Sequence, residues 1–233
     1  MKVDFHIHSK YSIDSNSDIN AILKYAKKKN LDGIAITDHN TIKGAIKASK
    51  MNEYKDFLVI IGEEIHTDVG DITGLFLNEE IKSRNSMDVI EEIKKQGGIV
   101  VLPHPYKAHK LNDKLVNSVD LIEIFNSRTI LELNEKAKKL AEEYSKPFIA
   151  GSDAHFASEI GMGKTIVNLT DFSDIGCIQK TLLSGKSDTL GILAPLYLQS
   201  ISQIIKSINM KEYGNVPIQI FWIIIRTLRS LHH

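Results

Sequence analysis

Cysteine, net charge and long apolar runs are all scarce in this chain, and each scarcity excludes a class of protein. Cys177 is the only cysteine among 233 residues, which excludes an internal disulfide and any metal site rich in thiolates. Lysine plus arginine and aspartate plus glutamate both number 29, so the bulk charge gives no reason to expect a nucleic-acid partner. The first residues, Met-Lys-Val-Asp-Phe-His, lack the apolar core of a signal peptide, and we therefore expect a cytoplasmic protein.

The most apolar stretch lies in residues 191–233, which we expect to form a helical extension. Apolar residues at helical spacing predict one helix that ends near Asn209, and Pro217 is typical of the first turn of a second helix. No apolar run reaches the ~20 residues of a transmembrane helix. We expect the extension to pack on the main domain or on a second subunit, because buried apolar helices of this length are common.

A second interpretation of the same segment is a helix that lies in the surface of a membrane. Trp222, together with Arg226 and Arg229, is typical of such interfacial helices. We favour packing, and peripheral membrane contact is the alternative.

Before residue 190, short apolar runs typical of strands alternate with helical patterns. The runs lie near 3–8, 33–37, 57–65, 72–77, 99–102, 120–125, 147–151 and 165–169. The predicted helices follow Asp18 as an N-cap, or occupy 86–96 with Ser86 as the cap, 129–145 and 174–184. The third and fourth runs are so close together that they predict a hairpin or a long active-site loop. The alternation predicts a parallel α/β fold, either an open doubly wound sheet or a closed barrel.

Histidines gather at the ends of these predicted strands, where they follow or end apolar runs: His6, His8, His39, His66, His104 and His155. His6 and His8 are two residues apart, so they lie on the same face of a strand and can reach one ion. Carboxylates accompany them, and burying such groups together is costly unless cations are present. Because nearly every strand ends in a potential metal ligand, we favour the closed barrel, whose strand ends converge at one mouth.

The order and spacing of these residues resemble the polymerase and histidinol phosphatase (PHP) family over residues 1 to about 170. The matching motifs are His6-x-His8, Asp14, Thr37-Asp38-His39-Asn40, Gly62-Glu-Glu64-Ile65, Pro103-His104-Pro105 and Gly151-Ser-Asp153-Ala-His155. The resemblance implies a distorted (β/α)7 TIM-like barrel over residues 1–190, with the helical extension at 191–233. It also implies two or three divalent metal ions at the barrel mouth and hydrolysis of phosphate esters.

The resemblance also implies which residues bind the metals. The first metal has the ligands His6, His8, Glu64 and Asp153; Glu64 bridges to a second metal with His104; and Asp14, His39 and His155 hold a third. Many relatives have a histidine where this chain has Asp71. Asp71 is one candidate to replace that ligand and His66 is another.

Three further residues are expected to assist. Asp38 is placed to orient an imidazole. Asn126 and Arg128 follow the strand at 121–125 and resemble an Asn-x-Arg motif of relatives, whose arginine we expect to grip a phosphate group.

The donor types limit the metal and the substrate. Imidazole and carboxylate ligands without thiolate suit zinc, manganese or iron better than magnesium. Three divalent cations would outweigh the carboxylates of Asp14, Glu64 and Asp153, so the pocket would attract a small dianionic phosphomonoester, attacked by a hydroxide that bridges the metals. We therefore expect a phosphatase or phosphodiesterase that acts on a small molecule or nucleotide. A metal-dependent amidohydrolase and a non-enzymatic, metal-stabilised interaction module remain alternatives.

Overall fold

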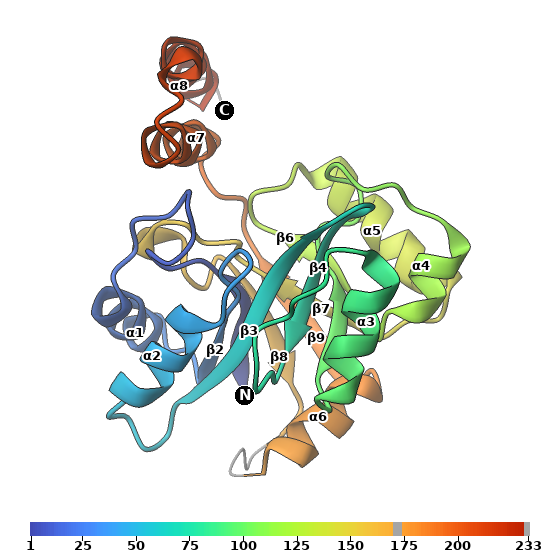
Figure 1. Cartoon of the computed structure of the whole chain (residues 1–233). Helices are drawn as coiled ribbons and strands as arrows, with labels where there is room; N and C mark the ends of the chain where they lie inside the picture. Colours follow the sequence, from blue (N-terminus) through green and yellow to red (C-terminus); the bar gives the residue numbers. More distant parts are fainter. Residues whose placement is uncertain (170–173, 231–233) are drawn as a thin grey trace.

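The strands form one curled sheet, which confirms the predicted α/β barrel (Figure 1). The computed structural model describes residues 1–169 and 174–230. The sheet has nine strands. Their order across the sheet is β7 (Phe148–Gly151), β6 (Leu121–Asn126), β5 (Ile99–Leu102), β4 (Gly70–Leu75), β3 (Leu58–Thr67), β2 (Gly33–Ile36), β1 (Lys2–Ile7), β8 (Gly163–Val167) and β9 (Ser187–Gly191).

The two edges of this sheet meet, so the barrel is nearly closed. β7 at one edge lies against β1, β8 and β9 near the other edge. A parallel bridge joins Ile7 to Ala154, and the Ala150 N–H donates a 2.8 Å hydrogen bond to Thr165 Oγ1. The strand count of seven was wrong. β4, β8 and β9 run antiparallel to their neighbours. Between β3 and β4 the connection is short, which permits antiparallel pairing without a crossover helix.

Helices cover the outside of the barrel, and the four helices predicted before residue 190 are all present among them. They are α1 (Ile19–Lys28), α2 (Lys43–Met51), α3 (Ser86–Lys95), α4 (Asp113–Ser118), α5 (Leu131–Glu143) and α6 (Ile175–Leu183). Asp18 caps α1 as predicted, because its carboxylate accepts the N–H of Asn20. The cap of α3 is Asn85 and not Ser86, since the Asn85 side chain reaches the next free backbone N–H groups while Ser86 is already helical.

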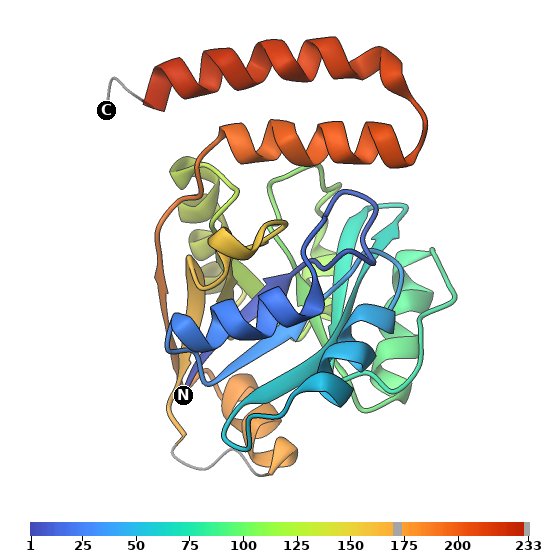
Figure 2. The same cartoon turned by 90° about the vertical axis from the view of Figure 1, so that its left-hand side faces the viewer.

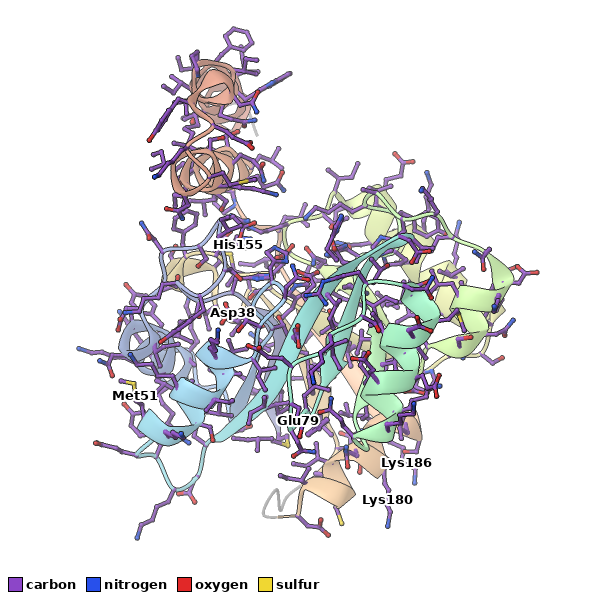
Figure 3. The ribbon with its side chains drawn as sticks, in the orientation of Figure 1. Asp38, Met51, Glu79, His155, Lys180 and Lys186 are labelled. Atoms are coloured by element: carbon purple, nitrogen blue, oxygen red, sulfur yellow. The ribbon has the colours of Figure 1, made fainter. Side chains whose placement is uncertain are left out.

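Apolar side chains fill the lower part of the barrel and leave its upper end to polar groups. Val3, Phe5, Ile60, Val101 and Ile149 belong to one buried cluster, which α6 closes from below (Figure 1). Polar side chains lie at the opposite end, where His155 and Asp38 are found far from Lys180 and Lys186 (Figure 3). The carboxyl ends of the parallel strands therefore form the mouth of the barrel, as expected for this architecture.

The carboxyl-terminal extension is a helical hairpin on the side of the mouth. α7 (Tyr197–Asn209) lies over the barrel and α8 (Val216–Ser230) lies against α7, farther from the barrel (Figure 2). A single 3₁₀ turn, η2 (Tyr213–Asn215), joins them. In the described part of the chain, no helix is long and apolar enough to cross a membrane.

α8 exposes much of its apolar surface. Ile218, Phe221 and Ile224 are each more than half exposed. The interfacial interpretation also depended on Arg226 and Arg229, whose side chains are not among those that the structure describes.

Candidate metal centre

The structure brings the expected ligand residues, with Asp71 and without His66, into four overlapping groups at the barrel mouth. Within each group the ligand atoms lie within 4.8 Å of one another. The first group is His6, His8 and Glu64; the second is Glu64, Asp71 and His104; the third is His8, Asp14, His39 and His155; and the fourth is His6, His104 and Asp153. Because they share members, they form a single polar cluster, which we call the mouth cluster.

A β-bulge in β1 directs the first two histidines into this cluster. The pairing of β1 with β2 shifts register between Asp4 and Ile7. Phe5 therefore packs inside the barrel, and the next residue, His6, also faces inward, as bulges allow. His6 and His8 are both almost completely buried.

The separations in this first group match those of donor atoms around one ion. His6 Nε2 and His8 Nε2 are 3.1 Å apart. Glu64 lies 3.4 Å from His6 Nε2 through Oε1 and 3.3 Å from His8 Nε2 through Oε2, and Asp153 Oδ1 lies 3.4 Å from His8 Nε2. Ligands at ~2.0–2.1 Å from a tetrahedral ion are about 3.3 Å from one another. The observed spacing therefore fits a transition-metal ion.

Glu64 also connects to a second group. Its Oε1 lies 3.0 Å from His104 Nε2, while His104 Nδ1 is buried and has no hydrogen-bond partner in the described structure. Asp71 belongs to this group, and its Oδ1 lies 2.9 Å from His66 Nδ1. His66 is three-quarters exposed and is in none of the four groups. It contacts Asp71 from the solvent side.

The third group is built around Asp14. Asp14 Oδ2 lies 3.4 Å from His39 Nε2 and 3.3 Å from His155 Nε2. Its other oxygen, Oδ1, is buried without a partner among the described residues. An unpaired, buried carboxylate oxygen is costly, and a bound cation would satisfy it.

The loop that carries Asp14 is held by Ser15. The Ser15 hydroxyl donates to the carbonyl oxygens of both His8 and His155. The position of Asp14 is thereby fixed against two other members of the mouth cluster.

Two buried carboxylates orient the imidazoles from behind. Asp38 accepts hydrogen bonds from Ser9 and Ser12, and the Ser12 hydroxyl lies 3.0 Å from His8 Nδ1. Asp38 therefore acts on His8 through Ser12. Glu123, which sequence reasoning missed, lies 3.1 Å from His6 Nδ1. Such contacts fix the tautomer and orientation of metal-binding histidines.

Two residues of the mouth cluster have strained backbones. His104 has a φ of 28° and Asp153 a φ of 54°, values that side chains other than glycine seldom adopt. Strain of this kind costs about 1–3 kcal/mol per residue and is typical of functional sites. The strained backbone at these two residues directs their side chains into the mouth cluster.

The pKa shifts of residues in the mouth cluster show that the cluster strongly attracts positive charge. Burial opposes the charging of His8, but Asp153 and Glu64 outweigh it and raise the pKa of His8 to about 9. Burial opposes ionisation of Asp153 too, yet Lys107 and His6 hold the pKa of that carboxyl well below its usual range. The carboxylates thus remain ionised and draw cations, whether protons or metals.

His155 behaves differently. Burial, His8 and Arg128 lower the pKa of His155 to about 4. Its imidazole is therefore neutral near pH 7, the form that a metal ligand requires.

Arg128 and Asn126, the residues expected to bind phosphate, form hydrogen bonds with other residues of the protein. The Arg128 Nε donates to Glu159 Oε1 at 2.8 Å, and Nη2 donates to Ser202 Oγ of α7 at 2.8 Å. Only 4% of the Arg128 side chain is exposed. Asn126 Nδ2 donates to Glu123 Oε2 at 3.0 Å, and lies 3.3 Å from Asp153 Oδ2.

Lys107 is the cation that sequence reasoning missed. Its Nζ lies 3.3 Å from Asp153 Oδ2, and 47% of its side chain is exposed. Burial of the ammonium works against its charge, but Asp153 and Glu64 raise the pKa of Lys107 above its ordinary value. No motif marked this lysine, because a lysine in a polar loop is usually a solvated surface residue.

Comparison with known proteins shows similarity to two archaeal sequences and to solved barrels. One uncharacterized protein of Methanocaldococcus jannaschii is 43% identical over 141 residues, which cover 54% of this chain and 82% of the relative. A second from the same organism is 36% identical over 173 residues, covering 69% of this chain and 68% of the relative.

Among solved structures, a two-domain protein of Bacteroides vulgatus, described as containing a predicted PHP-like metal-dependent phosphoesterase, has a TM-score of 0.70 at 20% identity. The match covers 82% of this chain and 65% of that one, so this chain spans just under two thirds of the length of that relative. PsfC of Pseudomonas syringae has a TM-score of 0.67 at 18% identity, and covers 88% of this chain and 97% of PsfC. At these identities the likeness shows the fold.

A family model completes the comparison. The PHP domain model matches residues 4–210, a span that includes all of the barrel except the first two residues of β1, together with the mouth cluster and α7. The chain belongs to the PHP domain family.

Proposed function

We propose that this protein is a metal-dependent hydrolase of phosphate esters, with two or three divalent cations bound in the mouth cluster. The ligands are His6, His8, Asp14, His39, Glu64, Asp71, His104, Asp153 and His155. The observation that carries this proposal is the set of donor separations of 3.0–3.5 Å among buried imidazole and carboxylate groups. Cations bound there would supply Lewis acidity toward a phosphoryl group and a nucleophilic water at neutral pH.

The donor set supports zinc, manganese or iron as the cation. Imidazoles make up more than half of the proposed ligands, and the chain's single cysteine, Cys177, is exposed and is in none of the four groups. Magnesium prefers an octahedral shell of oxygen ligands and binds few imidazoles.

The chain's own residues prepare the site for these cations. Glu64 contacts His6, His8, His39 and His104, and so links the groups. Asp38 and Glu123 hold the imidazoles in place. Because these contacts exist among buried residues of the fold, little rearrangement is needed on binding.

Two observations support a phosphate ester over a neutral amide as the substrate. Two cationic side chains, Lys107 and Arg128, lie beside the proposed metal ligands, and they favour a dianionic substrate. The Bacteroides relative is described as a predicted phosphoesterase. The amidohydrolase alternative also has a relative, a Chromobacterium violaceum protein described as an amidohydrolase with bound sulfate, similar in fold at a TM-score of 0.58.

A small phosphomonoester fits better than a nucleic acid. The formal net charge of the chain is zero, whereas nucleic-acid-binding surfaces are usually basic.

Metal removal and addition tests the proposal. Purified protein is treated with a chelator, reloaded with zinc, manganese, iron or magnesium, and assayed on matched panels of phosphomonoesters, phosphodiesters and neutral amides. We expect hydrolysis of phosphomonoesters that disappears on chelation and returns with a transition metal. Activity on amides alone would favour the amidohydrolase.

Two variants test the remaining alternative, a non-enzymatic interaction module. His8→Ala and Asp153→Ala should lose both bound metal and hydrolysis, while His66→Ala, outside the four groups, should keep both. Full hydrolysis by the first two variants would exclude the proposed site.

A further inference from the structure

Two cationic side chains reach the mouth cluster, and they differ in how they are held. Arg128 is buried, and two of its three guanidinium nitrogens hydrogen-bond to Glu159, Ser202 and the Leu198 carbonyl. Lys107 makes one long contact, 3.3 Å from Nζ to Asp153 Oδ2, and nearly half of its side chain is open to solvent. Of the two, Lys107 is therefore the better placed to meet a ligand that arrives from solution, because its side chain is 47% exposed and that of Arg128 only 4%.

The backbone of Lys107 is fixed relative to the proposed metal ligands. Its N–H donates a 2.8 Å hydrogen bond to the carbonyl oxygen of His104. The N–H of His104 in turn donates to Glu123 Oε2 at 2.9 Å, and Glu123 contacts His6. The lysine stem thus starts from a turn that is anchored within the mouth cluster.

The position of the Lys107 ammonium group beside Asp153 is not explained by a contribution to the stability of the fold. A half-exposed ion pair contributes little to stability. Its partner, Asp153, is also a member of a group that could hold a metal ion. A carboxylate that binds a divalent cation attracts a neighbouring ammonium less, so the ammonium group becomes available to another anion.

We propose that Lys107 binds the phosphate group of the substrate by donating a hydrogen bond to a non-bridging oxygen. This inference rests on the function proposed above. A compact, flexible ammonium suits a phosphate oxygen whose position changes during the reaction. Arg128 then serves to hold the strand-end loop against α7 and contributes positive potential from a fixed position.

Phosphate affinity, measured without turnover, is the direct test. Zinc-loaded parent protein and the variants Lys107→Met, Lys107→Arg and Lys110→Met are titrated with inorganic phosphate by calorimetry, and their zinc content is measured. Lys110 is the matched control, because it lies in the same loop but its Nζ contacts the Asp68 carbonyl. We expect Lys107→Met to weaken phosphate binding by about 10- to 100-fold, as for loss of a charge-assisted hydrogen bond. Lys107→Arg should restore most of the affinity, and Lys110→Met should match the parent.

Kinetics give a second readout. Lys107→Met should raise KM for a phosphomonoester such as p-nitrophenyl phosphate by a similar factor and should affect the singly charged bis(p-nitrophenyl) phosphate less. Zinc content equal to that of the parent, with phosphate affinity within twofold of the parent, would overturn the role of Lys107 and leave the hydrolase proposal intact. If no ester is cleaved by the parent, the hydrolase proposal fails, while the calorimetric comparison still decides whether Lys107 binds phosphate.

Discussion

The barrel mouth and the carboxyl-terminal hairpin depart from ordinary burial in opposite directions. At the mouth, charged residues such as Glu64 and Asp153 are almost completely buried. On α8, apolar residues such as Phe221 and Ile224 are more than half exposed. Burying a charge is costly unless it is compensated, whereas an exposed apolar side chain costs the folded chain little. Substitutions should therefore have large effects at the mouth and small ones on α8.

α7 belongs to both regions. Its Ser202 accepts a hydrogen bond from Arg128 at one side of the mouth, and the Asn209 side chain donates to the Ile13 carbonyl, next to Asp14, at 2.7 Å. The helix therefore connects the loop after β6 with the loop after β1. This agrees with the family match, which extends through α7 to residue 210.

The largest effect is expected from Glu64, which contacts the most imidazoles of the mouth cluster. Glu64→Ala should lower kcat/KM by at least about a thousandfold and remove more than one metal equivalent, because two groups lose a shared ligand. The neighbouring Glu63 lies on the outer face of β3, and Glu63→Gln should retain both metal and activity. Elemental analysis with parallel kinetics checks both, and full metal content in Glu64→Ala would contradict the assignment.

Substitution of one phenylalanine in the core and one in the hairpin compares how much each region contributes to the free energy of unfolding. Phe5 is 1% exposed and Phe221 is 56% exposed. Phe5→Ala should reduce the free energy of unfolding by about 3–5 kcal/mol, the usual cost of a large cavity, and Phe221→Ala by about 0.5 kcal/mol or less. Urea denaturation of the metal-free proteins provides the measurement. Equal losses would show that α8 packs more tightly than its exposure indicates.

Glu63 gives stability a pH dependence that is independent of the metals. Burial raises the pKa of Glu63 to about 7 from its ordinary value of 4.5. Between these values the folded state keeps a proton that the unfolded state has lost, so stability falls as pH rises from about 4.5 to 7. Relative to Glu63→Gln, the parent should lose up to about 3 kcal/mol across this range. Urea denaturation at pH 4.5 and pH 8 with chelator present tests this, and parallel pH profiles of parent and variant would refute it.

The smallest effect expected at the mouth concerns its contact with α7. Ser202→Ala removes the hydroxyl that accepts from Arg128 Nη2. We expect a loss of about 0.5–1.5 kcal/mol in stability and only a few-fold change in kcat/KM, since Glu159 still holds Nε. A loss of activity as large as that of Glu64→Ala would mean that α7 takes a direct part in the reaction.

The convergence of the mouth cluster could be predicted because its members end apolar runs. Parallel strands of a barrel bring such ends together whatever their separation in sequence, and this placed His6, His104 and His155 correctly. The approximate bounds of most strands followed from the same runs. β9 (Ser187–Gly191) was missed, because Ser-Asp-Thr-Leu-Gly has one large apolar residue, and three of its five residues are exposed in the structure.

Features that depend on tertiary contacts were harder to predict from the sequence. Glu123 had a signal, a carboxylate inside the apolar run Leu-Ile-Glu-Ile-Phe, which indicates a buried charge with a partner. Lys107 had none, because its role depends on where the loop after β5 folds. The helices α2 and α4 were also missed. α2 buries Gly44, Ala45 and Ala48, which give a weak apolar stripe, and α4 is only six residues long.

The binding of metal ions in the mouth cluster is best tested by anomalous diffraction from crystals of the zinc-loaded protein. We expect two or three strong peaks at the barrel mouth, each about 2.0–2.2 Å from imidazole nitrogens and carboxylate oxygens of the mouth cluster. Zinc found only at the surface, in protein that still cleaves phosphate esters, would contradict this expectation.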